Sequence, residues 1–159
     1  MRTLIQNVVT PELRERLLKI DAPRGQPVRD AWEGAALEIA EIVKQHAPVR
    51  IGGQSYWNLE SRSKGHLWHF DGCTSNLTPN HMPWCRYSAV TLLTAPWTFE
   101  GGAFMWEDGD QHGKIKDELF GSIFVYSSAA DNSPLWHQAT PHNGGERWMF
   151  LMFFEGTDE

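Results

Sequence analysis

The stretch with the clearest chemical potential is Leu67-Trp68-His69-Phe70-Asp71, where two side chains that can bind a metal stand two residues apart. The run reads as a strand, and successive side chains of a strand point to opposite faces. His69 and Asp71 are therefore expected on one face, with Trp68 and Phe70 on the other. Two donors can begin a metal site, but a catalytic ion needs a third ligand and open positions.

Two histidines near the C-terminus could supply the third ligand. His142 lies within the turn sequence Pro-His-Asn-Gly-Gly at residues 141–145, which predicts that its side chain sits at a hairpin tip. His137 precedes that turn, in a segment that can form a strand and aim its side chain inward. We therefore favour His137 over His142.

Arg147 stands at the start of residues 147–154, a segment that is otherwise apolar on both faces and predicts a central, buried strand. A buried guanidinium without an anion is costly. A ligand carboxylate, held by the two-pronged guanidinium fork, is the partner we favour. The alternative is an ion pair with an Asp or Glu near the beginning of the strand.

Two histidines and one carboxylate on one face, with positions left open, form the ligand set of non-haem Fe(II) oxygenases. Zinc would bind the same donors. Arg147, ten residues beyond His137, favours iron with an oxo-acid co-substrate. His-x-Asp alone is a weak indication, so the prediction depends on the whole set of His69, Asp71, His137 and Arg147.

The first part of the chain is expected to be helical support. Thr10-Pro11 is a helix start, which predicts a helix over residues 11–20. A second helix is predicted over residues 29–46, with Asp30 as its cap. Nothing in residues 1–49 calls for chemistry.

From residue 50 onward the pattern changes to short apolar runs divided by turn residues. The predicted strands cover residues 54–59, 66–70, 87–93, 102–107, 114–118, 121–126, 135–138 and 147–154. About eight short strands indicate a double-stranded β-helix, or jelly roll. We therefore predict a single α+β domain over residues 1–159, with helical support at 1–49 and the jelly-roll core at 50–155.

Composition limits the partners and the compartment. The net charge of −6 does not indicate a nucleic-acid surface. Cys73 and Cys85 are too few for a disulfide framework, and no apolar run is long enough to cross a membrane. We expect a cytoplasmic protein that binds neither nucleic acid nor membrane.

Aromatic and histidine residues outside the predicted set have simpler expected places. Four tryptophans are candidates for the wall of a site, although a place in an ordinary core is the more common one for each: Trp57, Trp84, Trp106 and Trp136. Three further histidines are expected in loops or at the surface: His66, His81 and His112.

Over about residues 56–154 the sequence resembles the 2-oxoglutarate and Fe(II)-dependent dioxygenases, in their prolyl 4-hydroxylase-like branch. The resemblance is carried by His69-Phe70-Asp71 and by the segments 86–93, 100–104 and 119–126. It is carried most specifically by the closing pattern from His137 to Arg147, in which His is followed by Pro, Gly and Arg at offsets four, eight and ten.

This resemblance implies that His69, Asp71 and His137 bind Fe(II) and that Arg147 pairs with the distal carboxylate of 2-oxoglutarate. A polar residue of the first or third core strand would also contact the co-substrate: Tyr87 is the first choice, followed by Tyr56 and Asn58. The implied reaction uses O2, hydroxylates an unactivated C–H bond and releases succinate and CO2. Ascorbate is a further implied cofactor.

The primary substrate is left open by the sequence. A peptidyl proline, a free amino acid and a small natural product all fit, and prolyl hydroxylases commonly carry Lys where this chain has Arg147. Two rivals keep the fold without this activity. One is a cupin-like metal-binding protein or Zn/Mn enzyme that needs no 2-oxoglutarate, and the other is a non-catalytic binding domain.

Overall fold

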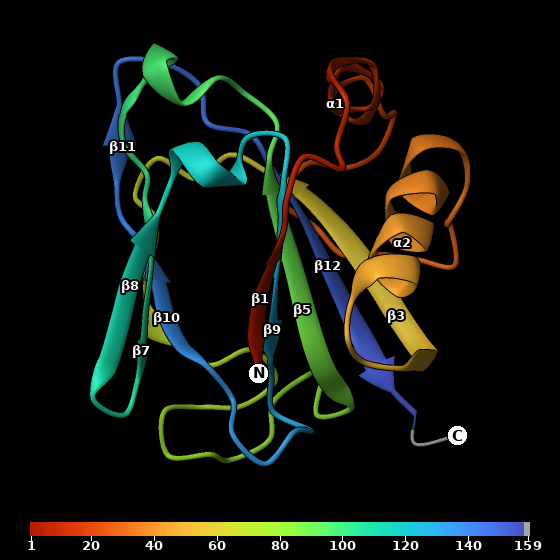
Figure 1. Cartoon of the computed structure of the whole chain (residues 1–159), viewed down its shortest axis with the longest axis vertical. Coiled ribbons are helices and arrows are strands. Elements are labelled where there is room, and N and C mark those ends of the chain that lie inside the picture. Colours follow the sequence, from red (N-terminus) through yellow and green to blue (C-terminus); the bar gives the residue numbers. More distant parts are fainter. Residues whose placement is uncertain (158–159) are drawn as a thin grey trace.

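The structure is a computed structural model that describes residues 1–157. Two antiparallel sheets face each other, and two helices cover the outer side of the larger sheet (Figure 1). This is the arrangement of a jelly roll. No helix among the described residues combines the length and the apolar character needed to cross a bilayer.

The larger sheet has six strands. In spatial order they are β1 (Arg2–Ile5), β9 (Ile123–Ser127), β5 (Cys85–Leu92), β12 (Met149–Gly156), β3 (Ile51–Glu60) and β2 (Val28–Arg29). The second sheet has four strands, in the order β4 (His66–His69), β10 (Trp136–Ala139), β7 (Phe104–Asp108) and β8 (Gln111–Ile115). A third, two-stranded sheet pairs β11 (His142–Asn143) with β6 (Glu100–Gly101). Two short 3-10 turns complete the elements, η1 (Pro96–Thr98) and η2 (Asp117–Leu119).

The N-terminal helices form for recognisable local reasons. Helix α1 (Pro11–Leu18) begins after Thr10, whose side chain accepts a hydrogen bond from the Leu13 amide. Helix α2 (Gly34–His46) begins later than the predicted residue 29, because Val28 and Arg29 form β2 beside β3. The N-cap of α2 is Glu33, with an extended backbone, whereas Asp30 lies three residues earlier with a φ of 61°, so its predicted role is wrong.

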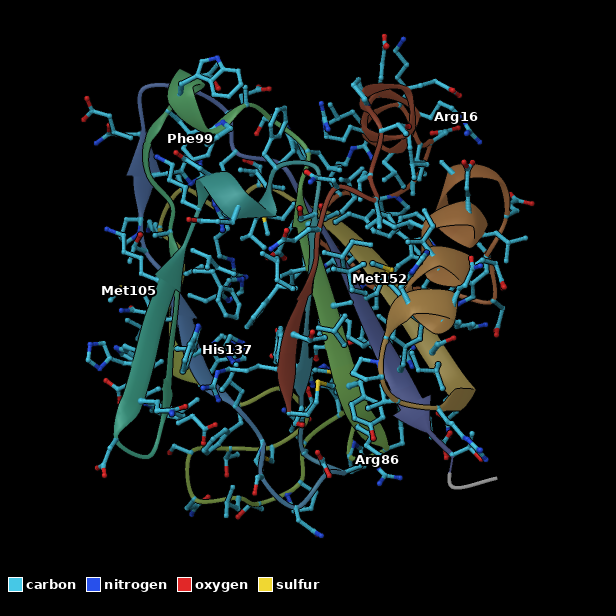
Figure 2. All side chains as sticks on the ribbon, viewed as in Figure 1. Arg16, Arg86, Phe99, Met105, His137 and Met152 are labelled. Carbon is cyan, nitrogen blue, oxygen red and sulfur yellow. The ribbon has the colours of Figure 1, made fainter. Side chains whose placement is uncertain are left out.

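Strand β12 separates the two cores of the molecule. Phe150, Met152 and Phe154 pack with the helices on one face, whereas Met149 and Leu151 face the space between the sheets. Figure 2 shows Met152 on the helix side of the larger sheet and His137 between the sheets. The two-residue alternation of an extended strand produces this division.

Each predicted strand overlaps an observed one, although the overlap with β8 is limited to residues 114 and 115. Strands β1, β2, β6 and β11 were not predicted, so the described chain has twelve short strands instead of eight. Three of these four are two residues long, and β1 precedes the first predicted helix. Such short pairings are set by tertiary contacts and leave little pattern in the sequence.

Candidate active site

Three predicted metal ligands meet between the two sheets. Nε2 of His69 lies 3.3 Å from Oδ1 of Asp71, and Nε2 of His137 lies 3.4 Å from the same oxygen. All three ligand atoms are within 4.8 Å of one another. Within residues 1–157 this is the only group of three or more His, Cys, Asp or Glu side chains so arranged.

Paired strands bring the two histidines together. His137 of β10 stands directly opposite His69 of β4 in the antiparallel register, and their ring centroids are 4.3 Å apart. Asp71 follows β4 by two residues. Gly72 then turns the chain with a φ of 88°, at a place where a Cβ atom would lie 2.7 Å from the Ala129 side chain. Glycine is therefore required immediately after the carboxylate.

Each imidazole is oriented by a hydrogen bond to the backbone carbonyl two residues earlier in the chain. Nδ1 of His69 is 2.6 Å from the Leu67 carbonyl, and Nδ1 of His137 is 2.8 Å from the Leu135 carbonyl. A carbonyl oxygen only accepts hydrogen bonds, so Nδ1 carries the proton in both rings and Nε2 is directed toward Asp71. Two Nε2 atoms and one carboxylate oxygen, converging with a side open to a cavity, suit a divalent iron ion.

Without a metal ion, the pKa values of the groups in the site are set largely by their contacts with Asp71. Burial opposes ionisation of this carboxyl group, but the imidazoles of His137 and His69 outweigh it and hold the Asp71 pKa well below its usual range. Burial likewise lowers the pKa of His69, but the hydrogen bond and charge of Asp71 outweigh it and leave the His69 pKa raised. Burial and the adjacent carboxylate of Asp71 raise the pKa of Tyr126 well above its usual value, so its phenol stays protonated.

The raised pKa of His69 predicts a pH dependence of stability in the metal-free protein. Protonated His69 stabilises the fold below its ordinary pKa, and this contribution is lost as the pH rises through the raised value. We expect the thermal unfolding midpoint to fall less in His69→Gln than in the unchanged protein between about pH 6 and about pH 9. The side chain is 35% exposed, so solvent screening limits the difference to less than about 1 kcal/mol, or roughly 2–4 °C.

The matched control is His112→Gln, because His112 lies exposed on β8. This control should lose as much stability over the same pH range as the unchanged protein. An equal loss in His69→Gln would contradict the assignment of the pH dependence to His69.

Arg147 lies just before β12 and reaches the same cavity as the three ligands. Only 5% of the residue is exposed. Its Nε donates to the Gly102 carbonyl at 2.8 Å, and a Cβ atom on Gly102 would lie 2.5 Å from its Cδ. Burial lowers the pKa of Arg147 to about 10, partly opposed by the charge of Glu60. The described residues offer it no carboxylate within 4 Å, so the predicted alternative of an ion pair is not observed.

The cavity between the sheets has a volume of about 390 Å³. It contains the three ligands and Arg147, together with Tyr56 and Asn58 of β3. The Tyr56 hydroxyl donates to the Met82 sulfur at 2.9 Å, and Asn58 Nδ2 donates to Glu60 at 3.1 Å. One cavity therefore holds a metal-ligand set and a buried cation.

Tyr87 does not line this cavity, contrary to its predicted role at the co-substrate. Tyr87 is buried. Two residues further along β5, Ala89 packs in the core on the helix side of the sheet, whereas Val90 faces the other way and lines the cavity. Because side chains alternate along β5, the odd-numbered Tyr87 shares the face of Ala89. Placing Tyr87 at the co-substrate required a register that one sequence does not reveal.

Other predicted places also change. His142 is buried in β11 instead of at an exposed hairpin tip, with its ring against Phe99. His66 lies in β4, hydrogen-bonds Glu60 at 2.8 Å and lines the cavity. His81 is exposed in a loop, as predicted, and also lines the cavity. None of the four tryptophans proposed for the wall lines it.

Among the cavity residues that sequence reasoning missed, Glu60 and Tyr126 act on the charged groups of the site. Glu60 shares the inner face of β3 with Tyr56 and Asn58, so extending the predicted strand by one residue with period two would have found it. Tyr126 had been assigned to a strand, but the residues before it, Ile123, Phe124 and Val125, are all apolar and give no sign of which face meets the ligands. No pattern could have identified its contact with Asp71.

Comparison with known proteins gives a fold assignment. No protein-family model matches the chain, and no curated protein matches it in sequence. Among solved structures, a prolyl 4-hydroxylase from Pseudomonas putida aligns with a TM-score of 0.67 and 15% identity, covering 98% of this chain and 92% of that one. The viral collagen prolyl hydroxylase of Paramecium Bursaria Chlorella virus-1, in complex with 2-oxoglutarate, aligns with a TM-score of 0.65 and 13% identity, covering 98% and 96%.

A third structure, HygX from Streptomyces hygroscopicus with nickel and 2-oxoglutarate bound, aligns with a TM-score of 0.59 and 13% identity, covering 99% of this chain and 83% of that one. The chain therefore has the fold of the 2-oxoglutarate/Fe(II) oxygenases. Two of these three structures are prolyl hydroxylases, the kind of protein that the sequence resembles.

Proposed function

We propose that the protein is a non-haem Fe(II)- and 2-oxoglutarate-dependent dioxygenase that hydroxylates an unactivated C–H bond, in the manner of prolyl 4-hydroxylases. The observation that carries this proposal is Arg147, a buried cation with no carboxylate within ion-pair distance, in the same cavity as His69, Asp71 and His137. A buried cation favours an anionic ligand, and 2-oxoglutarate has a carboxylate at each end.

In the proposed site, His69, Asp71 and His137 hold Fe(II), which supplies the redox chemistry with O2 when bound. Arg147 holds the distal carboxylate of 2-oxoglutarate and so fixes the co-substrate lengthwise in the cavity. Tyr56 and Asn58 are candidates for further contacts with the co-substrate. The apolar side chains Val90, Phe104 and Leu151 exclude water from the same space.

The primary substrate is proposed to be a small molecule or a peptidyl side chain. The cavity volume of about 390 Å³ has to hold the co-substrate and the reacting part of the substrate together. Arg62 and His81 line the cavity and are both exposed and polar. They suit a substrate of which one part enters the cavity while another part stays in water.

The proposal is tested by adding 2-oxoglutarate to Ni(II)-loaded protein and measuring the thermal unfolding midpoint, then by measuring succinate release from Fe(II)-loaded protein. We expect a rise in the midpoint and a slow release of succinate that a true substrate accelerates; free amino acids and proline-containing peptides are the first panel. The rival Zn/Mn enzyme or cupin-like protein predicts no rise with 2-oxoglutarate. Absence of both effects would exclude the proposed activity.

A further inference from the structure

Tyr126 occupies a position in the cavity wall where its hydroxyl meets one metal ligand. The residue lies on β9, is 1% exposed, and its ring centroid is 5.4 Å from Phe104 and 4.8 Å from His137. The hydroxyl donates to Oδ2 of Asp71 at 2.7 Å, a short charge-assisted hydrogen bond. The same hydroxyl also lies 3.4 Å from Nε2 of His137, a longer contact than the one to Asp71.

The two oxygens of Asp71 therefore have different partners. Oδ1 faces Nε2 of His69 and of His137, at 3.3 and 3.4 Å, while Oδ2 is hydrogen-bonded to Tyr126. An ionised carboxylate accepts hydrogen bonds through both oxygens but has no donor of its own. The hydrogen bond consequently fixes the rotation of the carboxylate in which Oδ1 is the oxygen nearest to both imidazoles.

We propose that Tyr126 is a positioning residue that makes Asp71 present a single oxygen, Oδ1, to the metal. This inference rests on the proposed function, because it assumes that the triad binds a metal. A carboxylate that used both oxygens would occupy an additional coordination position, which the co-substrate and O2 need to be open. Holding Oδ2 in a hydrogen bond preserves that space.

A second buried tyrosine shows that this contact is specific to Tyr126. Tyr56 lines the same cavity and is 3% exposed, yet its hydroxyl donates to the Met82 sulfur instead of to a carboxylate. Burial of a phenol in this cavity therefore does not by itself produce a bond to Asp71. The placement of residue 126 on β9 produces it.

The test is Tyr126→Phe, which removes the hydroxyl and keeps the ring. Removing a hydrogen-bond partner of a metal ligand typically weakens metal binding by about 10- to 100-fold, and we expect a loss in this range for Ni(II) measured by calorimetry. We also expect a changed visible absorption of bound Co(II), since its intensity follows coordination number. The spectrum at saturating metal does not depend on affinity, so it remains decisive if the variant is less stable.

The matched control is Tyr87→Phe, which removes a hydroxyl from another buried tyrosine, outside the cavity. It should keep the metal affinity and the Co(II) spectrum of the unchanged protein. Tyr126→Phe with affinity and spectrum equal to those of the control would overturn the positioning role while leaving the proposed activity intact. If the unchanged protein bound neither ion, the proposed metal site would be excluded, and the role of Tyr126 with it.

Discussion

Alanine in place of His69, Asp71 or His137 is expected to reduce Fe(II)-dependent succinate formation to background. Each replacement removes one of three donor atoms that converge within 4.8 Å. The loss of metal affinity should exceed the roughly 10- to 100-fold effect of removing an outer hydrogen-bond partner, because a ligand itself is lost. Calorimetry with Ni(II) and succinate release measured on the same preparations separate metal binding from turnover.

His112→Ala provides the control for these three variants, since it removes an exposed imidazole from β8, away from the cavity. It should retain metal binding and turnover. Asp71→Ala also leaves the buried imidazole of His137 and the partly exposed imidazole of His69 without their carboxylate, so the unfolding midpoint of each metal-free variant should be recorded. Turnover that survived in all three alanine variants would refute the assigned triad.

Arg147→Ala is expected to weaken 2-oxoglutarate binding far more than metal binding. Truncating one partner of a buried, hydrogen-bonded charge pair costs about 2–5 kcal/mol, so the apparent constant for the co-substrate should rise at least roughly 30-fold. The variant keeps all three metal ligands, and its Ni(II) affinity should therefore change little. Arg147→Lys keeps the charge but loses the planar guanidinium fork. Its apparent constant for 2-oxoglutarate should lie between those of the unchanged protein and Arg147→Ala.

Arg50→Ala is a suitable comparison, because Arg50 is an exposed residue just before β3 and does not line the cavity. Its co-substrate constant should equal that of the unchanged protein. An Arg147→Ala variant with an unchanged constant for 2-oxoglutarate would show that another group holds the distal carboxylate. The proposal would then lose the observation that carries it.

The residues that converge were predictable because their spacing carries local information. His69 and Asp71 stand two apart beside a strand, and the interval from His137 to Arg147 is the short connection from β10 through β11 to β12. Alternation and turn composition follow from backbone geometry, so a single sequence contains them. The same local reasoning located α1, whose Thr10 cap forms the expected hydrogen bond.

The parts that failed depend on contacts between distant segments. The late start of α2 follows from the pairing of Val28 and Arg29 with β3, and the burial of His142 follows from the pairing of β11 with β6. The face of β5 on which Tyr87 lies is set by the register with β12 and β9. None of these pairings has a signature within its own segment, so propensity alone could not anticipate them.

Strand β12 is a wall shared by two compartments, and this limits how the protein can change. Phe150 and Met152 pack against the helices. Met149 and Leu151, each one residue before them in the strand, line the cavity. A substitution at Met149 or Leu151 that changed the shape of the cavity would stand next to residues of the helix-side core, and would therefore tend to lower the stability of the fold. New substrate preferences would therefore arise more readily in the exposed loop at residues 74–81, where Asn80 and His81 line the cavity outside both hydrophobic cores.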